Sequence, residues 1–190
     1  MTASESHLFA SINGYRNIDD FNFSESKDWL ERRMKGRMGE ILVEEMFKSL
    51  GFKTIPSGME NSFPHLMGDL KGKSDKISHE IRKTPDLLVY DPRTDKNFYI
   101  DVKFRADGRM TKDRLDNNPH DRAYILLISP YHIKCALVEE IKAGKSLTKG
   151  RSNFLGDRKE FQFETKHKRI IHRYRHLASN VFSKIPFTSF

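Results

Sequence analysis

The chain has 190 residues, of which 37% are hydrophobic and 32% charged, and it carries a formal net charge of +8 with a pI near 9.5. This length and composition predict a globular chain with a hydrophobic core and argue against global disorder or a fibrous repeat. We find neither a signal-peptide pattern nor an apolar run long enough to cross a bilayer, so we expect a cytoplasmic protein without a membrane partner. The positive charge favours a polyanionic partner, although charge alone identifies none.

The first part of the chain predicts an N-terminal arm followed by a long helix. Residues 1–23 are polar and largely aperiodic and predict an arm, whereas residues 24–190 are expected to form a single domain. From Met34 to Leu50 apolar residues recur at helical spacing, including Met34, Ile41, Leu42 and Phe47, and Gly51 then provides a stop.

Strand signals follow this helix. A short strand is expected over residues 52–55, and the polar stretch from Ser57 to Arg82 predicts a long loop. Two strand-like segments, residues 84–90 and 97–105, are joined by Asp91-Pro92-Arg93-Thr94-Asp95-Lys96, which has strong turn chemistry. These two segments predict a β-hairpin.

The second half of the chain predicts further strands and a closing helix. The continuous apolar run at 123–128 is typical of a central strand covered on both faces. A strand is also expected at 133–138, where the single cysteine, Cys135, should be a buried and inert thiol. Residues 161–163 alternate as an edge strand would, and residues 165–183 form an amphipathic pattern with a basic face.

The second strand of the hairpin divides its side chains between two faces. If Asp86 of the first strand opens onto the same place as Asp101 and Lys103, two carboxylates and an ammonium group converge there. Mg²⁺ prefers one or two carboxylates, with water and phosphate oxygens filling its remaining positions. The pattern therefore predicts a metal site suited to phosphodiester hydrolysis. One face would hold Phe98, Ile100, Val102 and Phe104, and the other Tyr99, Asp101, Lys103 and Arg105.

The order of these segments resembles a known enzyme family. A helix containing Glu40 is followed by a strand that begins at Pro85-Asp86 and, after fourteen intervening residues, by Asp101-Val102-Lys103. This order resembles the PD-(D/E)XK nuclease superfamily, and the helix with its following Leu50-Gly51-Phe52 looks like the opening of archaeal Holliday junction resolvases. The likeness covers roughly residues 34–105. It implies an α/β, restriction endonuclease-like fold with a mixed, mostly antiparallel central β-sheet flanked by α-helices.

The resemblance also implies roles for individual residues. Asp86 and Asp101 would bind Mg²⁺, with Mn²⁺ expected to substitute, Lys103 would be the catalytic lysine, and Glu40 would complete the metal site from the helix. A bound Mg²⁺ offsets charge on the phosphorus oxygens, and Lys103 could hold the attacking water or the phosphate in line. We therefore expect a Mg²⁺-dependent endonuclease whose partner is nucleic acid, with DNA as the expected substrate. The resemblance permits a homodimer.

Other interpretations of the same residues stay open. Asp101 and Lys103 could form an exposed charge pair on a half-buried sheet, with Asp86 merely starting a strand and Glu40 solvated. The same metal chemistry would serve an RNA endonuclease, and a nucleic-acid-binding or assembly module could keep the fold without turnover. The polar stretch before residue 82 and the chain after residue 124 depart from junction resolvases, so branched DNA is not specified.

Basic residues elsewhere are candidates for phosphate contacts, which position a nucleic acid without reading its bases. The basic face of the closing helix could follow a phosphate backbone or simply be solvated. His167, His172 and His176 include a pair spaced for zinc, but no cysteine or acidic partner accompanies them, so a basic helix face is the preferred interpretation. The candidate nucleic-acid-binding residues are Lys83, Arg105, Arg109, Lys112, Arg169 and Arg173.

Overall fold

The computed structural model describes residues 23–58, 73, 75–115 and 117–184, with side chains described from residue 30 onward. The chain divides into two compact units, Met1–Lys35 and Gly36–Phe190, and the boundary falls within helix α2 (Phe23–Ser49). Apart from the start of this helix, the first unit and the arm expected over residues 1–23 lie outside the described residues. In the described part of the chain, no helix has the length and apolar character needed to cross a membrane.

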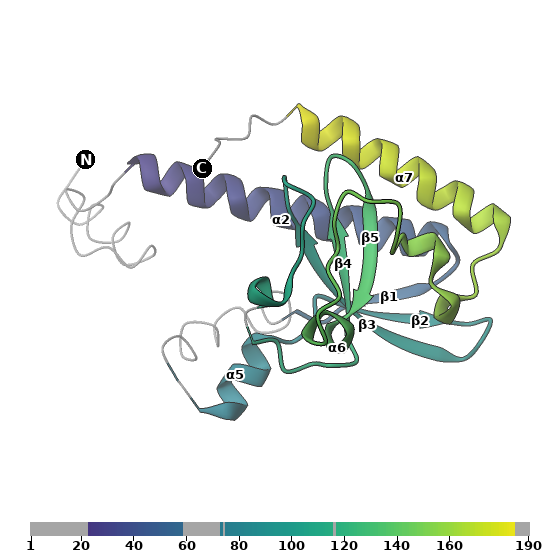
Figure 1. Cartoon of the computed structure of the whole chain (residues 1–190), viewed down its shortest axis with the longest axis horizontal. Helices are drawn as coiled ribbons and strands as arrows, with labels where there is room; N and C mark the ends of the chain where they lie inside the picture. Colours follow the sequence, from purple (N-terminus) through teal and green to yellow (C-terminus); the bar gives the residue numbers. More distant parts are fainter. Residues whose placement is uncertain (1–22, 59–72, 74, 116, 185–190) are drawn as a thin grey trace, which may run out of the picture. The chain divides into compact units, whose positions relative to one another are not determined.

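A five-stranded mixed sheet forms the centre of the second unit (Figure 1). The described strand pairs are antiparallel except for β3 and β4, which run parallel. The α/β class, the mixed sheet with flanking helices and the hairpin are therefore confirmed, and the strand expected at 123–128 is internal to the sheet, between its third and fifth strands. In spatial order the strands are β1 (Lys53–Pro56), β2 (Leu87–Asp91), β3 (Lys96–Phe104), β4 (Tyr124–Ile128) and β5 (Ile133–Leu137).

Helices α2 and α7 (Thr165–Ser183) pack on one face of this sheet, which we call the helix-covered face (Figure 1). Phe47 of α2 and Phe182 of α7 are fully buried in the same core cluster as Ile100 of β3. The two helices also bond directly, because the Tyr174 hydroxyl donates to the Glu45 carbonyl at 3.1 Å. Burial of these large apolar groups is the main stabilising contribution of this layer.

The opposite face, which we call the second face, is covered over β4 and β5. Ile125 and Leu127 are fully buried there in a smaller cluster with Ile141 of helix α6 (Val138–Lys142) and with Met110. The registers place Asp101 of β3 beside Ile125, and Lys103 beside Leu127, on this same face. Asp101 and Lys103 therefore lie at the edge of the covered half of the second face.

Helix α2 ends where the sequence predicts a stop. Gly51 has φ of +86°, a left-handed conformation that favours glycine, and the Phe52 N–H donates to the Phe47 carbonyl at 3.0 Å. The buried stripe of α2 differs from the expected one. Val43 is fully buried, whereas Met34 is 57% exposed and Ile41 is 50% exposed.

The loop expected from Ser57 to Arg82 differs from its prediction, because it contains a short helix, α5 (Lys76–Arg82). The start of α5 is capped by Asp75, whose side chain accepts the Ser78 N–H at 2.8 Å. The rest of that loop lies mainly outside the described residues. Cys135 is fully buried, as expected, and burial raises the pKa of its thiol.

The edge strand expected at residues 161–163 is wrong. The chain there forms a 3₁₀ helix, η4 (Lys159–Phe161), followed by Gln162 with φ of +49°. Phe161 is fully buried, and its ring stacks on Phe163 with centroids 5.3 Å apart. The alternation of aromatic residues therefore comes from ring packing, and in the sequence it looks the same as the alternation of a strand.

Candidate functional site

Asp86 and Asp101, which we call the acid pair, face each other where β2 and β3 meet. The antiparallel register pairs Leu87 with Ile100, so its continuation by one residue sets Asp86 opposite Asp101. The backbone at Asp86 is held by the residue that follows β1, since the Asp86 carbonyl accepts the Ser57 N–H at 2.9 Å. Its Oδ2 accepts the Val102 N–H at 2.7 Å, which fixes the carboxylate against β3.

Asp101 is almost completely buried, with 5% of its surface exposed. Its Oδ1 accepts a hydrogen bond from Lys103 Nζ at 2.5 Å, and its Oδ2 accepts one from Asn118 Nδ2 at 3.0 Å. Asn118 is itself buried and is oriented by accepting the His120 N–H through Oδ1 at 2.9 Å. This burial contradicts the interpretation of Asp101 as half of an exposed charge pair.

The charges of these groups are strongly coupled. Burial, together with the neighbouring Asp101 carboxylate, raises the pKa of Asp86 to about 8, while Lys103 acts in the opposite direction. Burial alone would lower the pKa of Lys103, but the Asp101 and Asp86 carboxylates outweigh it and hold that pKa above its usual value. Two acids and one amine therefore share a site where a further positive charge would be favoured.

Glu40 lies on α2, close enough that its charge also helps to raise the pKa of Asp86. A Cβ built at the preceding residue, Gly39, would be 3.7 Å from Val102 Cγ1, so the helix approaches β3 closely here. The Glu40 carboxylate forms an ion pair with Arg37 at 2.6 Å. Glu40 therefore lies within electrostatic reach of Asp86, and its carboxylate is paired with Arg37.

The donor set fits a hard cation that keeps much of its own water. Among the described residues, no group of three or more His, Cys, Asp or Glu side chains is arranged to hold a metal ion. The acid pair supplies two carboxylates, within the one or two that Mg²⁺ ordinarily takes from a protein, and Asp86 is hard to ionise without a further cation beside Lys103. Asp86 and Asp101 are the residues that could hold such an ion.

The predicted phosphate contacts fall into two groups. Lys83, Arg105, Arg109 and Lys112 lie on the segments that lead into β2 or out of β3. Arg169 and Arg173 lie on α7, whose apolar side packs on the helix-covered face, opposite the face that carries Asp101 and Lys103. The structure therefore separates these two arginines from the acid pair by the thickness of the sheet.

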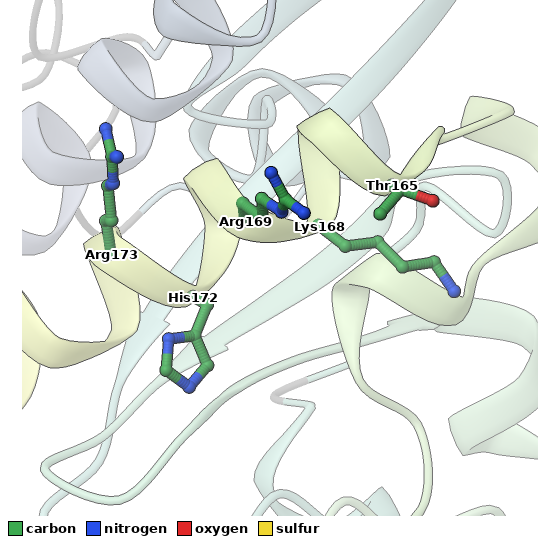
Figure 2. Close-up of a pocket in the computed structure, with 5 residues that line it drawn as sticks. All are labelled: Thr165, Lys168, Arg169, His172 and Arg173. Atoms are coloured by element: carbon green, nitrogen blue, oxygen red, sulfur yellow. The ribbon is translucent and has the colours of Figure 1, made fainter.

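The basic side of α7 is hollowed by an open groove of about 460 Å³ (Figure 2). His172, on this groove, lies against His176 with ring centroids 4.5 Å apart, and the guanidinium of Arg175 is 2.9 Å from its Nε2. His167 is buried, and its Nδ1 accepts the Glu164 N–H at 3.0 Å. These contacts favour a basic helix face over a zinc site. The groove is lined by Thr165, Lys168, Arg169, His172 and Arg173.

Asn118 is the site residue that sequence reasoning missed. The turn-like run that contains it, Asn117-Asn118-Pro119, indicates a loop but does not indicate that the loop folds back onto Asp101.

Comparisons with protein-family models, with curated proteins and with solved structures find no match to this chain.

Proposed function

We propose that this chain is a metal-dependent nuclease that hydrolyses phosphodiester bonds in nucleic acid, with DNA as its expected substrate. The observation that carries the proposal is the acid pair beside Lys103, in which Asp101 is buried and the half-buried Asp86 has a pKa raised to about 8. Strongly perturbed carboxyl groups next to a cation are characteristic of functional sites. If the two acids had only a structural role, the folded protein would be more stable with their side chains further apart.

Each residue has a role that follows from its contacts. Asp86 and Asp101 would hold Mg²⁺, which when bound offsets charge on the phosphate and lowers the pKa of a bound water. Lys103, whose ammonium already donates to Asp101, would donate to the attacking water or to a phosphate oxygen. Val102 and Asn118 hold the two carboxylates in place through their N–H groups.

The proposal includes membership of the PD-(D/E)XK nuclease superfamily, with its restriction endonuclease-like fold. Its support is the order of a helix with Glu40, a strand preceded by Asp86, and a neighbouring antiparallel strand with Asp101 and Lys103 on one face. The parallel pairing of the next strand, β4, with β3 adds to this order.

A cleavage assay tests the proposal directly. The protein is incubated with Mg²⁺ or Mn²⁺ and linear, nicked, branched and single-stranded DNA, with matching RNA substrates to separate the two sugars. Asp101→Asn and Lys103→Met should abolish cleavage while leaving binding intact. Asp121→Asn is the matched control, because Asp121 forms an exposed ion pair with Lys142, whose Nζ is 2.6 Å from Asp121 Oδ1. Absence of cleavage by the wild type on every substrate contradicts the proposal.

One observation favours a second candidate, a nucleic-acid-binding module without turnover. Both oxygens of Asp101 already accept hydrogen bonds from protein groups, which satisfies the carboxylate without any ion. In that case Lys103 would be a fixed structural cation. Calorimetric titration with Mg²⁺ separates the two, since binding that disappears in Asp101→Asn supports the nuclease.

A further inference from the structure

The second face of the sheet continues beyond the acid pair as a row of three apolar side chains, of which the outer two are exposed and the middle one is half-buried. The registers align Ile55 of β1, Leu88 of β2 and Tyr99 of β3 across the three strands. Because side chains alternate along a strand, this row shares the face of Asp86 and Asp101, two residues further along. Ile55 is 59% exposed and Tyr99 49% exposed, whereas Ala123, which continues the row just before β4, is buried.

This surface continues to a tyrosine that contacts both a lysine and a carboxylate, since the Tyr90 hydroxyl donates to Asp95 Oδ1 at 3.2 Å. The next row contains Lys53 and Tyr90, with the lysine ammonium 5.9 Å from the centroid of the tyrosine ring. On this face of β1, β2 and β3, Asp101 is the acid within the strands, with Asp86 just before β2. A ligand here would meet aromatic and aliphatic surface, then a lysine, with the acid pair at its other end.

We propose that Ile55, Leu88 and Tyr99 form a stacking surface for an unpaired nucleotide next to the acid pair. This inference rests on the proposed nuclease function and names its substrate class as single-stranded nucleic acid. Aromatic side chains on an open sheet bind bases through the faces of their rings. A duplex hides those faces in its own base stack, whereas an unpaired strand leaves them free.

The spacing supports one continuous path for such a strand. Tyr99 precedes Asp101 by two residues, which is about 7 Å along an extended strand. A base stacked on Tyr99 would therefore bring an adjoining phosphate to the acid pair and Lys103. The surface would position the strand, while the acid pair would carry the chemistry.

A binding experiment without divalent cations tests this surface independently of hydrolysis. In EDTA, fluorescence anisotropy measures the affinity of the full chain for a labelled oligothymidine and for duplex DNA of the same length. Tyr99→Ala should weaken single-strand binding by about 10-fold or more, and Tyr99→Phe should restore it. Tyr131→Ala is the matched control, because Tyr131 is 55% exposed on the turn between β4 and β5.

The outcomes separate this inference from the proposed function. Single-strand affinity that is equal in Tyr99→Ala and wild type, with both folded by thermal unfolding, overturns the stacking surface. Preference for duplex over single strand by the wild type also overturns it. If Tyr99→Ala loses binding selectively, the surface is supported even where the wild type cleaves nothing, a result that would contradict the nuclease alone.

Discussion

Two carboxylates are held together at this site by groups that do not neutralise them fully. The Val102 N–H fixes Asp86, and Asn118 with Lys103 fixes Asp101. One cation thus serves two acids, so the two carboxylates repel each other whenever both are ionised. Such stored repulsion is typical of sites that trade stability for activity.

Asp86→Asn should stabilise the metal-free protein and abolish cleavage. The folded pKa of Asp86, about 8, lies above its ordinary value of 3.8, so the folded state binds the extra proton and the wild type loses stability as the pH rises between these values. Asparagine can still accept the Val102 N–H but carries no charge, so above that range we expect a gain on the order of 1 kcal/mol. Urea unfolding in EDTA across this pH range measures the gain. A variant less stable than wild type at the alkaline end contradicts the repulsion.

Asn118→Ala should impair the reaction without unfolding the chain. Loss of the Nδ2 donor frees one oxygen of Asp101, and the loss of such a supporting contact typically costs about 10- to 100-fold in metal affinity or rate. We expect a higher Mg²⁺ requirement in the cleavage assay, with partial recovery at high Mg²⁺. The matched control is Asn97→Ala, on an exposed position of β3. Equal Mg²⁺ requirements in the two variants would rule out a positioning role for Asn118.

The sequence predicts part of this site and misses another part for a physical reason. Asp101 and Lys103 are two residues apart in one strand, so the strand period alone places them on one face. Asp86 follows from the hairpin, whose turn fixes the register. Asn118 is seventeen residues from Asp101 and lies in a loop, where no periodic pattern indicates which side chain returns to the strand.

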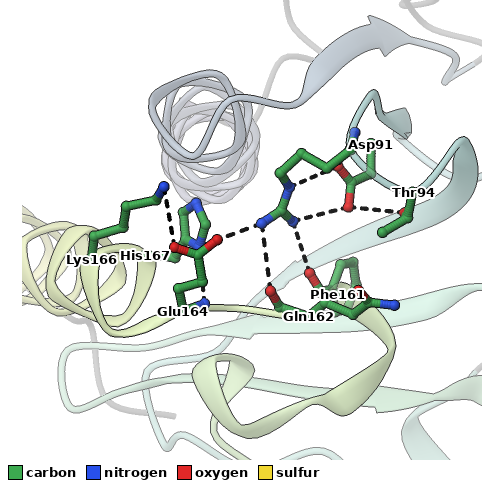
Figure 3. Close-up of polar contacts among 8 residues, drawn as sticks. Asp91, Thr94, Phe161, Gln162, Glu164, Lys166 and His167 are labelled. Atoms are coloured by element: carbon green, nitrogen blue, oxygen red, sulfur yellow. Dashed lines mark hydrogen bonds and ion pairs between the residues drawn. The ribbon is translucent and has the colours of Figure 1, made fainter.

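At the scale of elements, the turn of the hairpin anchors the segment that the sequence assigns wrongly to a strand. Arg93 forms an ion pair with the fully buried Asp91 at 2.9 Å and also donates to the Phe161 carbonyl at 2.9 Å (Figure 3). The Asp91 carboxylate also accepts from the Thr94 hydroxyl at 3.1 Å. The bond from Arg93 satisfies the Phe161 carbonyl of η4, which a strand would have paired with a neighbouring strand.

Arg93→Met should destabilise the protein strongly. It leaves the buried Asp91 carboxylate without its partner, a change that typically costs about 3–5 kcal/mol. Lys142→Met is the matched control, since its partner Asp121 is exposed and such pairs contribute at most about 1 kcal/mol. Chemical denaturation of both variants measures the difference. Equal losses of unfolding free energy would contradict the anchoring role of Arg93.

The same contrast explains which elements the sequence could predict. The hairpin, β4 and α7 have long or continuous patterns whose period matches their structure, and these patterns predict each element close to its observed bounds. Helix α5 has seven residues and η4 has three, too few for a period to emerge. Their conformations depend on a cap at Asp75 and on tertiary bonds from Arg93.

At the scale of the second unit, positive charge lies on both sides of the sheet. Lys103 and Arg105 are at the end of β3, whereas the basic groove of α7 lies over the helix-covered face. A strand of nucleic acid bound at the acid pair would reach this groove only by passing around the edge of the sheet. If the groove contacts the same nucleic acid, it would add affinity for phosphate, and the chemical step would stay at the acid pair.

Reversing two charges on α7 should lower affinity without changing the chemical step. The double variant Arg169→Glu, Arg173→Glu takes the net charge from +8 to +4, as does the control Arg151→Glu, Lys159→Glu on another exposed segment. If α7 contacts phosphates, the first variant alone should reduce the slope of log affinity against log salt by about 2, since each contact releases roughly one counterion. Its single-turnover cleavage rate at saturating protein should equal that of wild type, because the acid pair is untouched. Identical salt slopes for the two variants would show that the helix face is merely solvated, since total charge is matched and the positions alone differ.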